Sequence, residues 1–221
     1  MHNILSIKRI SNFMHYYGML ILVSVIALFA TWYWMIYAIT APAKNEKISF
    51  FVEAEALIDE NFENDLRIHL KNKGLLEVRV YTMSIYNSDM ANQYERFGTE
   101  ADFLILRDID LVDMAEAITY SFIKISNGLI DNILDNLDIS PKFYTYGEEN
   151  YGIKIYDQTD DIYNQTIGIE NFCQFAKEED AISDYYLLFN SNSVNFGQYN
   201  SASLSSLAID AAQFFFQRYQ L

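Results

Sequence analysis

The sequence predicts a single transmembrane helix followed by an α/β domain with an open, mainly parallel sheet and flanking helices. Residues 16–39 form a run of 24 positions without a charged side chain. After this run, short β-branched and aromatic segments alternate with segments whose apolar residues recur every three or four positions, an order typical of parallel strands joined by helices. The net charge also changes sign. Residues 1–43 carry +2, whereas residues 44–221 hold 13 basic and 30 acidic side chains and carry −17.

The uncharged run has the length and the flanks of a membrane anchor. At about 1.5 Å per residue it would span roughly 36 Å as a helix, enough to cross a bilayer core with some tilt. Tyr16 and Tyr17 at one end and Trp32 and Trp34 at the other are of the type found at membrane interfaces. Lys8 and Arg9 precede the run, and basic residues of this kind are typical of the cytoplasmic side of a membrane helix, so they predict its orientation. We expect residues 1–15 to be cytoplasmic, 16–39 to span the cell membrane, 40–46 to form a linker, and 47–221 to form an extracytoplasmic domain.

A cleaved signal peptide and a lipid anchor are the two alternatives to a membrane-spanning helix. Residues 41–43, Ala-Pro-Ala, resemble a signal-peptide cleavage site. The apolar run is about twice as long as a secretory signal core, and its tryptophan-rich end is typical of a membrane interface, so both features favour the anchor. A lipoprotein would need a cysteine directly after the run, and the single cysteine of the chain is Cys173. We therefore expect a single-pass protein held in the lipid bilayer by its own helix.

The first half of the outer domain predicts strands separated by helical segments. Residues 47–53 and 77–83 are short β-branched and aromatic segments, which indicate strands. Between them, apolar residues at 58, 62, 66 and 70 recur at helical spacing until Gly74, which predicts an amphipathic helix. A helical or loop segment then leads to residues 101–107, an almost continuous apolar run typical of a strand covered on both faces.

The second half predicts more helices and two further strands. Asp110 is expected to cap a helix whose apolar stripe extends to Ile125, and a second stripe over 129–137 ends before Pro141. The remaining expected elements are strands at 151–156 and 184–190, a short helix at about 169–176, and a closing helix at 204–219. Together they fit one domain of ordinary size, or at most a domain with a small subdomain inserted between residues 140 and 180.

Polar side chains follow the three strands that are predicted first. In open α/β sheets, ligands bind beyond the carboxyl ends of the strands. Six residues occupy those positions: Glu53, Glu55, Ser84, Tyr86, Arg107 and Asp108. Such groups bind sugars or peptides, although solvation of loops explains them as well. They are the candidate ligand-binding residues.

A second candidate surface lies in the tyrosine-rich stretch 142–166. Its tyrosines predict an exposed aromatic surface, on which Tyr144, Tyr146 and Tyr151 would contact a protein partner. Replacing all three should weaken partner association without unfolding the domain.

Several kinds of chemistry find no support in the sequence. The outer domain has one histidine, His69, and one cysteine, Cys173, and no CxxC or HExxH motif, so we expect no metal site, no cofactor and no catalytic residues. Asp157, Asp160 and Asp161 could hold calcium, but the segment lacks the glycine and distal glutamate of a calcium-binding loop, which favours a solvated acidic turn. A net charge of −17 repels a phosphate backbone, so we expect no nucleic-acid partner.

Four segments of the outer domain resemble one lobe of the bacterial extracellular solute-binding proteins of ABC transporters. They are KISFFVEAEALIDENFENDL with LEVRVYTM, the strand ADFLILRD, the segment YYLLFNSNSVNFG at 185–197, and the closing helix. Members of that family bind a ligand between two lobes, whereas this domain has room for one lobe and at most a reduced second.

This resemblance implies a membrane-anchored binding or accessory domain that acts with an ABC transporter permease and takes a sugar or peptide ligand. The alternative is a structural subunit of a membrane complex that contacts another protein through its acidic and tyrosine-rich surface and has no small-molecule ligand. An enzyme is the least favoured class.

Overall fold

The computed structural model describes residues 7–83, 92, 94–134, 140–167, 169–174, 183–196 and 207–219. The chain divides into two compact units, Met1–Ala41 and Pro42–Leu221.

The first unit is a single long helix, α1 (Ile7–Thr40), which includes the predicted span. Within it, His15–Thr40 has a mean hydropathy of 2.2 and is long and apolar enough to cross a membrane, and none of this stretch is buried inside the protein. The hydroxyl groups of Ser24, Thr31 and Thr40 each donate to the carbonyl four residues earlier, at 2.8 Å. These bonds satisfy the hydroxyl groups within the helix itself.

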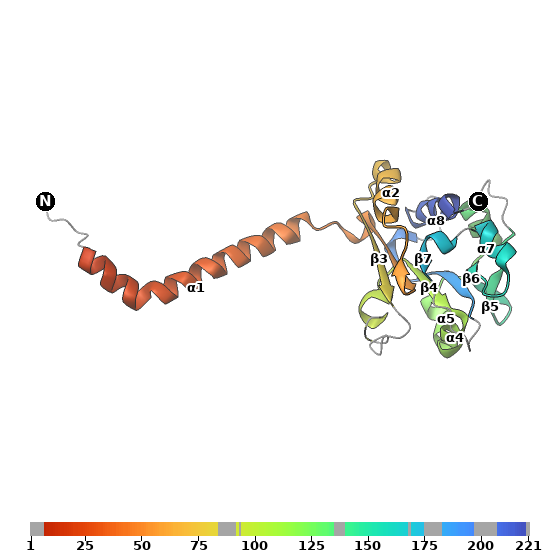
Figure 1. The fold of residues 1–221 in the computed structure, drawn as a ribbon, viewed down its shortest axis with the longest axis horizontal. Coiled ribbons are helices and arrows are strands. Elements are labelled where there is room, and N and C mark those ends of the chain that lie inside the picture. Colours follow the sequence, from red (N-terminus) through yellow and green to blue (C-terminus); the bar gives the residue numbers. More distant parts are fainter. Residues whose placement is uncertain are drawn as a thin grey trace. The chain divides into compact units, whose positions relative to one another are not determined.

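The second unit is built on a six-stranded sheet with the order β3-β1-β4-β8-β6-β5 (Figure 1). The strands are β1 (Lys47–Glu53), β3 (Glu77–Met83), β4 (Phe103–Arg107), β5 (Phe143–Tyr146), β6 (Glu149–Tyr156) and β8 (Tyr185–Phe189). Strand β1 is parallel to β3 and β4, while β8 runs against both β4 and β6, and β5 runs against β6. Four strands therefore share one direction, and the predicted α/β class is confirmed.

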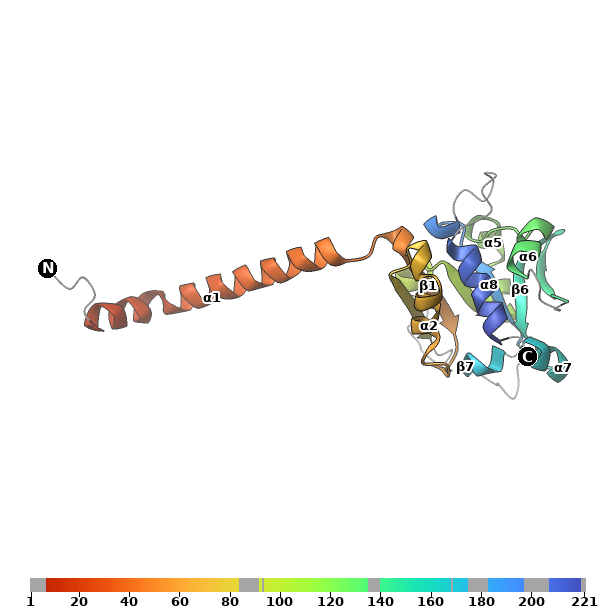
Figure 2. The same cartoon turned by 90° about the horizontal axis from the view of Figure 1, so that it is seen from above.

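One face of the sheet is covered by α2 (Phe62–His69), α6 (Asn127–Ile133), α7 (Asp161–Ile167) and α8 (Leu207–Tyr219), of which α2, α6 and α8 are seen together in Figure 2. Aromatic rings fill the space between sheet and helices. Phe50 of β1 stacks on Phe103 with ring centroids 4.6 Å apart and meets Phe62 of α2 edge-on at 5.3 Å. This face holds the larger part of the core.

The other face packs against α4 (Asp108–Asp113), α5 (Ala115–Ser121) and η3, a π-helical turn at Tyr94–Gly98. Phe51 and Leu104 point to this second face, since side chains alternate along a strand. The remaining elements are the two-stranded sheet of β2 (Ala56–Leu57) and β7 (Cys173–Gln174) and the short 3-10 turns η1 (Lys44–Glu46), η2 (Lys71–Lys73), η4 (Ile169–Asn171) and η5 (Val194–Phe196).

Two helices are shorter than their apolar patterns predict. The helix expected from residue 58 begins at Phe62, because the backbone N–H groups of Ile58 and Asp59 donate to the carbonyl of Phe172. The helix expected to reach Ile125 breaks at Met114 and ends at Ser121, after which the chain pairs with the end of β8. In both places long-range backbone pairing overrides the local period.

The region after residue 140 also differs from the expectation. A hairpin of β5 and β6 replaces the single strand, with Gly147 at φ 65° in the turn, a conformation that favours glycine. Helix α7 was not predicted. Where a helix was expected at 169–176, the described part forms η4 and the short strand β7.

Candidate functional site

The carboxyl edge of the sheet brings two predicted residues together, Glu53 at the end of β1 and Arg107 at the end of β4. The Nε of Arg107 donates to Oε1 of Glu53 at 2.9 Å and to Oδ2 of Asp110 at 2.8 Å. The backbone N–H of Arg107 donates to Oε2 of Glu53 at 3.1 Å. One guanidinium therefore serves two carboxylates, and the side chain of Glu53 is fully buried.

Burial raises the pKa of Glu53 to about 7, and the negative charge of Asp110 acts in the same direction, while the bond from the Arg107 backbone opposes it. A buried carboxyl next to a second carboxylate holds its proton more tightly than one in water.

Asp108 opens α4 and lies beside a separate set of charges. Its Oδ1 accepts from the backbone N–H of Ile109 at 2.8 Å, and its own N–H donates to the carbonyl of Asp184 at 2.9 Å. Burial raises the pKa of the Asp108 carboxyl. These hydrogen bonds of Asp108 go to Ile109 and Asp184 and not to Glu53 or Arg107.

Two lysines neutralise most of the acidic turn that follows β6. Lys154 donates to Asp157 at 3.1 Å and to Asp184 at 2.5 Å, and Lys142 donates to Asp157 at 3.1 Å and to Asp160 at 3.0 Å. Despite burial, the lysine and Thr159 bonds hold the pKa of Asp157 well below its usual range. Within the described ranges there is no group of three or more His, Cys, Asp or Glu side chains that could hold a metal ion.

Glu55, another predicted ligand-binding residue, makes a separate contact. Glu55 is exposed, and its Oε2 accepts from Nε2 of Gln174 on β7 at 2.9 Å. Ser84 and Tyr86 lie outside the described residues.

The three predicted partner-binding tyrosines differ in exposure. Tyr146 is exposed, and Tyr144 is half-buried against Tyr186 with ring centroids 5.4 Å apart. Tyr151 is buried in the core of the second face, so the expectation that it is exposed is wrong. From β6 it joins the buried cluster that also holds Tyr186 and Leu188, instead of facing solvent. Partner binding by these tyrosines stays a prediction.

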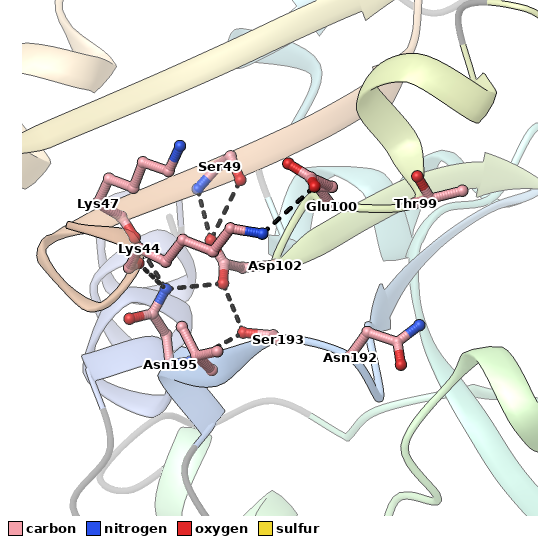
Figure 3. A pocket seen from close by; sticks show the side chains of 10 residues that line it. Lys44, Lys47, Ser49, Thr99, Glu100, Asp102, Asn192, Ser193 and Asn195 are labelled. Atoms are coloured by element: carbon pink, nitrogen blue, oxygen red, sulfur yellow. Dashed lines mark hydrogen bonds and ion pairs between the residues drawn. The ribbon is translucent and has the colours of Figure 1, made fainter. Parts of the chain in front are cut away.

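A pocket of about 270 Å³ lies at the opposite, amino edge of the sheet (Figure 3). Ser49 of β1 and Asp102, just before β4, form its base, and the loop after β8 forms one wall. The full lining is Lys44, Lys47, Ser49, Thr99, Glu100, Asp102, Asn192, Ser193, Val194 and Asn195. We call this pocket the amino-edge pocket.

Asp102 ties the base of the amino-edge pocket to its wall. Its Oδ2 accepts from the backbone N–H of Ser49 at 2.8 Å and from the Ser49 hydroxyl at 3.2 Å. Its Oδ1 accepts from Oγ of Ser193 at 2.5 Å and from Nδ2 of Asn195 at 2.8 Å. Burial raises the pKa of Asp102, and these hydrogen bonds oppose the increase. With four donors around it, Asp102 is a structural anchor of the pocket.

Two buried asparagines fix the remaining walls. Nδ2 of Asn190 donates to the carbonyls of Ala101 at 2.6 Å and Thr99 at 3.1 Å. Nδ2 of Asn195 also reaches the carbonyl of Lys47 at 2.8 Å, while its buried Oδ1 has no hydrogen-bond partner among the described residues. The pocket is therefore preformed by bonds between segments that are far apart in the chain.

A second, smaller pocket of about 60 Å³ adjoins the first and shares Lys47, Ser49 and Glu100 with it. Its other lining residues are Ile48, Arg79, Tyr81, Arg96 and Phe97. Basic side chains thus gather at this edge of an acidic domain.

Sequence reasoning missed the amino-edge pocket because the rule applied to the strands selects only their carboxyl ends. The run Asn190-Ser191-Asn192-Ser193 was visible as a polar loop after a strand. Ser193 bonds to Asp102 and Asn190 to the carbonyl of Ala101, with about 90 residues between the partners, and local patterns do not reveal such contacts.

No family model matches the chain, and no curated protein matches it. Among solved structures, the crystal structure of a cyclo/maltodextrin-binding protein complexed with maltotetraose is similar over 53% of this chain and 30% of that chain, with 18% sequence identity and a TM-score of 0.32. The similarity therefore covers less than a third of the length of that protein.

Proposed function

We propose that this chain is a membrane-anchored binding domain that takes a small polar ligand in the amino-edge pocket. It would work on the extracytoplasmic side, beside an integral membrane partner such as an ABC transporter permease. The observation that carries the proposal is the preformed pocket, whose base and walls are joined through Asp102.

The size and lining of the amino-edge pocket suit a small hydrophilic molecule. Its volume equals that of about nine water molecules, which suggests a solute with on the order of ten non-hydrogen atoms. Hydroxyl, amide, ammonium and carboxylate groups line it, as expected for a sugar or a short peptide-like solute. Because its walls are already bonded to one another, binding would require little ordering of the protein.

The anchor is supported by α1, in which His15–Thr40 is long and apolar enough to cross a membrane and exposes large apolar side chains. Lys8 and Arg9 on the flank before the apolar run favour a cytoplasmic N-terminus. The permease follows from the resemblance of the outer domain to a solute-binding lobe.

Ligand binding can be tested on the full chain in lipid nanodiscs by thermal unfolding with a panel of sugars and short peptides. A ligand at 100 times its Kd should add about 2.7 kcal/mol, which corresponds to roughly 5–11 °C for a domain of this size. Asn192→Trp should fill the pocket and abolish the shift. Asn72→Trp, at an exposed position of η2, is the matched control and should keep it.

The outcome also separates the two functional classes. If no sugar or peptide raises the unfolding temperature, and the chain co-purifies with a membrane complex, then the alternative of a purely structural subunit is correct and the binding proposal fails.

A further inference from the structure

We propose that the amino-edge pocket recognises its ligand through an oxyanion, a phosphate or carboxylate group, held by Lys47 with Arg79 and Arg96 beside it. The inference rests on the proposed function and names the chemical class of the ligand. It depends on how charge is distributed around the two adjoining pockets.

The outer domain carries −17, yet four basic residues line the two pockets: Lys44, Lys47, Arg79 and Arg96. Two of them are neutralised. Lys44 pairs with Glu100 at 3.3 Å, and Arg79 pairs with Glu77. Lys47 and Arg96 form no ion pair with any residue that the structure describes. A local positive charge on an acidic protein attracts an anion to that place.

The sheet brings these side chains to one face. In the parallel pairing of β1 and β3, Lys47 is opposite Glu77 and Ser49 is opposite Arg79. Lys47 and Arg79 both line the smaller pocket, so an anionic group bound there would lie between their long side chains.

Arg96 lies over the ring of Phe97. Its guanidinium carbon lies 5.0 Å from the centroid of the Phe97 ring, and Phe97 stacks on Tyr81 with ring centroids 4.6 Å apart. Stacking on an aromatic face restricts a guanidinium while leaving its N–H groups free to donate. This arrangement suits bidentate binding of an oxyanion.

The acidic residues of the pocket do not cancel this attraction. Both oxygens of Asp102 already accept hydrogen bonds from Ser49, Ser193 and Asn195, which spread its charge over the base of the pocket. Glu100 is at the rim and is paired with Lys44. The hydroxyl of Ser49 and the amide of Asn192 would contact the uncharged part of the ligand.

The anionic group could belong to a soluble molecule or to a lipid headgroup. Lys44 follows Thr40, the last residue of α1, by four positions in the chain. Both sources present the same phosphate chemistry, so the experiment must separate them.

The test uses the full chain in phosphatidylcholine nanodiscs, titrated by calorimetry with glucose 6-phosphate, glucose and inorganic phosphate. We expect glucose 6-phosphate to bind at least tenfold more tightly than glucose. Lys47→Gln should weaken its binding about tenfold, which is 1.4 kcal/mol, and Arg96→Gln several-fold. Lys71→Gln, which removes a charge from η2, should change the affinity less than twofold. The affinity should also fall between 50 and 500 mM salt.

The second part of the test uses nanodiscs that contain phosphatidylglycerol, and it asks whether a lipid headgroup is the ligand. If the headgroup is the ligand, these discs raise the unfolding temperature without any soluble addition, and Lys47→Gln removes the increase. If glucose and glucose 6-phosphate bind equally and only Asn192→Trp blocks them, the oxyanion inference is wrong while the proposed function stands. If neither the three titrants nor phosphatidylglycerol gives an effect that depends on Lys47, the inference is overturned.

Discussion

Glu53 gives the outer domain a pH dependence of stability that replacement by glutamine should remove. Its carboxyl is fully buried, and its pKa is raised from 4.5 to about 7 in the folded protein. Between these two values the folded state binds more protons than the unfolded state. The free energy of unfolding must therefore fall as the pH rises from 4.5 through 7.

The size of the effect follows from the shift. Each pKa unit corresponds to 1.36 kcal/mol. Deprotonation of Glu53 should therefore lower the free energy of unfolding of the wild type by about 3 kcal/mol between pH 4.5 and pH 8. In Glu53→Gln the side chain is neutral throughout. Its amide N–H₂ replaces one carboxylate oxygen and cannot accept, so one of the two hydrogen bonds from Arg107 is lost, which costs about 1 kcal/mol at every pH. The variant should thus be less stable than the wild type at pH 5 and more stable at pH 8.

Thermal unfolding of the full chain in detergent, followed by near-UV circular dichroism, can measure this. The signal should come from tyrosine, because both tryptophans lie in residues 1–43, outside the domain. A change of about 3 kcal/mol corresponds to roughly 6–12 °C in Tm. Glu60→Gln, at an exposed position, is the control and should keep the wild-type slope.

Equal slopes for wild type and Glu53→Gln between pH 5 and pH 8 would refute the reasoning. They would mean that the single guanidinium of Arg107 offsets both burial and the charge of Asp110, so that Glu53 titrates near its ordinary pKa.

Three further predictions concern the core, a turn and the anchor. Phe50→Ala should lower the free energy of unfolding by about 3–5 kcal/mol in a denaturant titration, since it leaves a cavity among four aromatic side chains; a loss below 1 kcal/mol would contradict this packing. Gly147→Ala should cost about 1 kcal/mol because φ at this position is 65°, and an unchanged Tm would argue against the turn. Because Cys173 is buried, a membrane-impermeant maleimide on intact cells should label Glu60→Cys but not the wild type, and absence of labelling would disprove an extracytoplasmic domain.

The parts of the fold that could be predicted are those set by neighbouring residues. The strands at 47–53 and 77–83 have the predicted bounds, because each is a short apolar segment between turn residues. The helix after residue 110 was predicted too long, since Phe122 pairs with Asn190, and no local pattern encodes a partner 68 residues away. The hairpin at Gly147 was missed although its glycine and flanking tyrosines were visible.

One part of the candidate site could likewise be predicted from the sequence, and the other part could not. The contact between Glu53 and Arg107 could be predicted from the sequence, because parallel neighbouring strands end at the same edge of the sheet. The amino-edge pocket depends on Asp102 meeting Ser193 and Asn195, residues more than 90 positions later, and only the antiparallel insertion of β8 beside β4 brings them together.

The two edges of the sheet differ in how their charges are used, and this difference favours the amino edge for ligand binding. At the carboxyl edge, Arg107 is held by Glu53 and Asp110, and Lys154 by Asp157 and Asp184. A ligand that took either cation would leave a buried carboxylate unpaired, at a cost of about 3–5 kcal/mol. At the amino edge, Lys47 has no such partner among the described residues, so an anion there would gain the attraction without breaking an existing pair. The usual preference of open α/β sheets for their carboxyl edge is thus opposed here by the internal ion pairs that fill it.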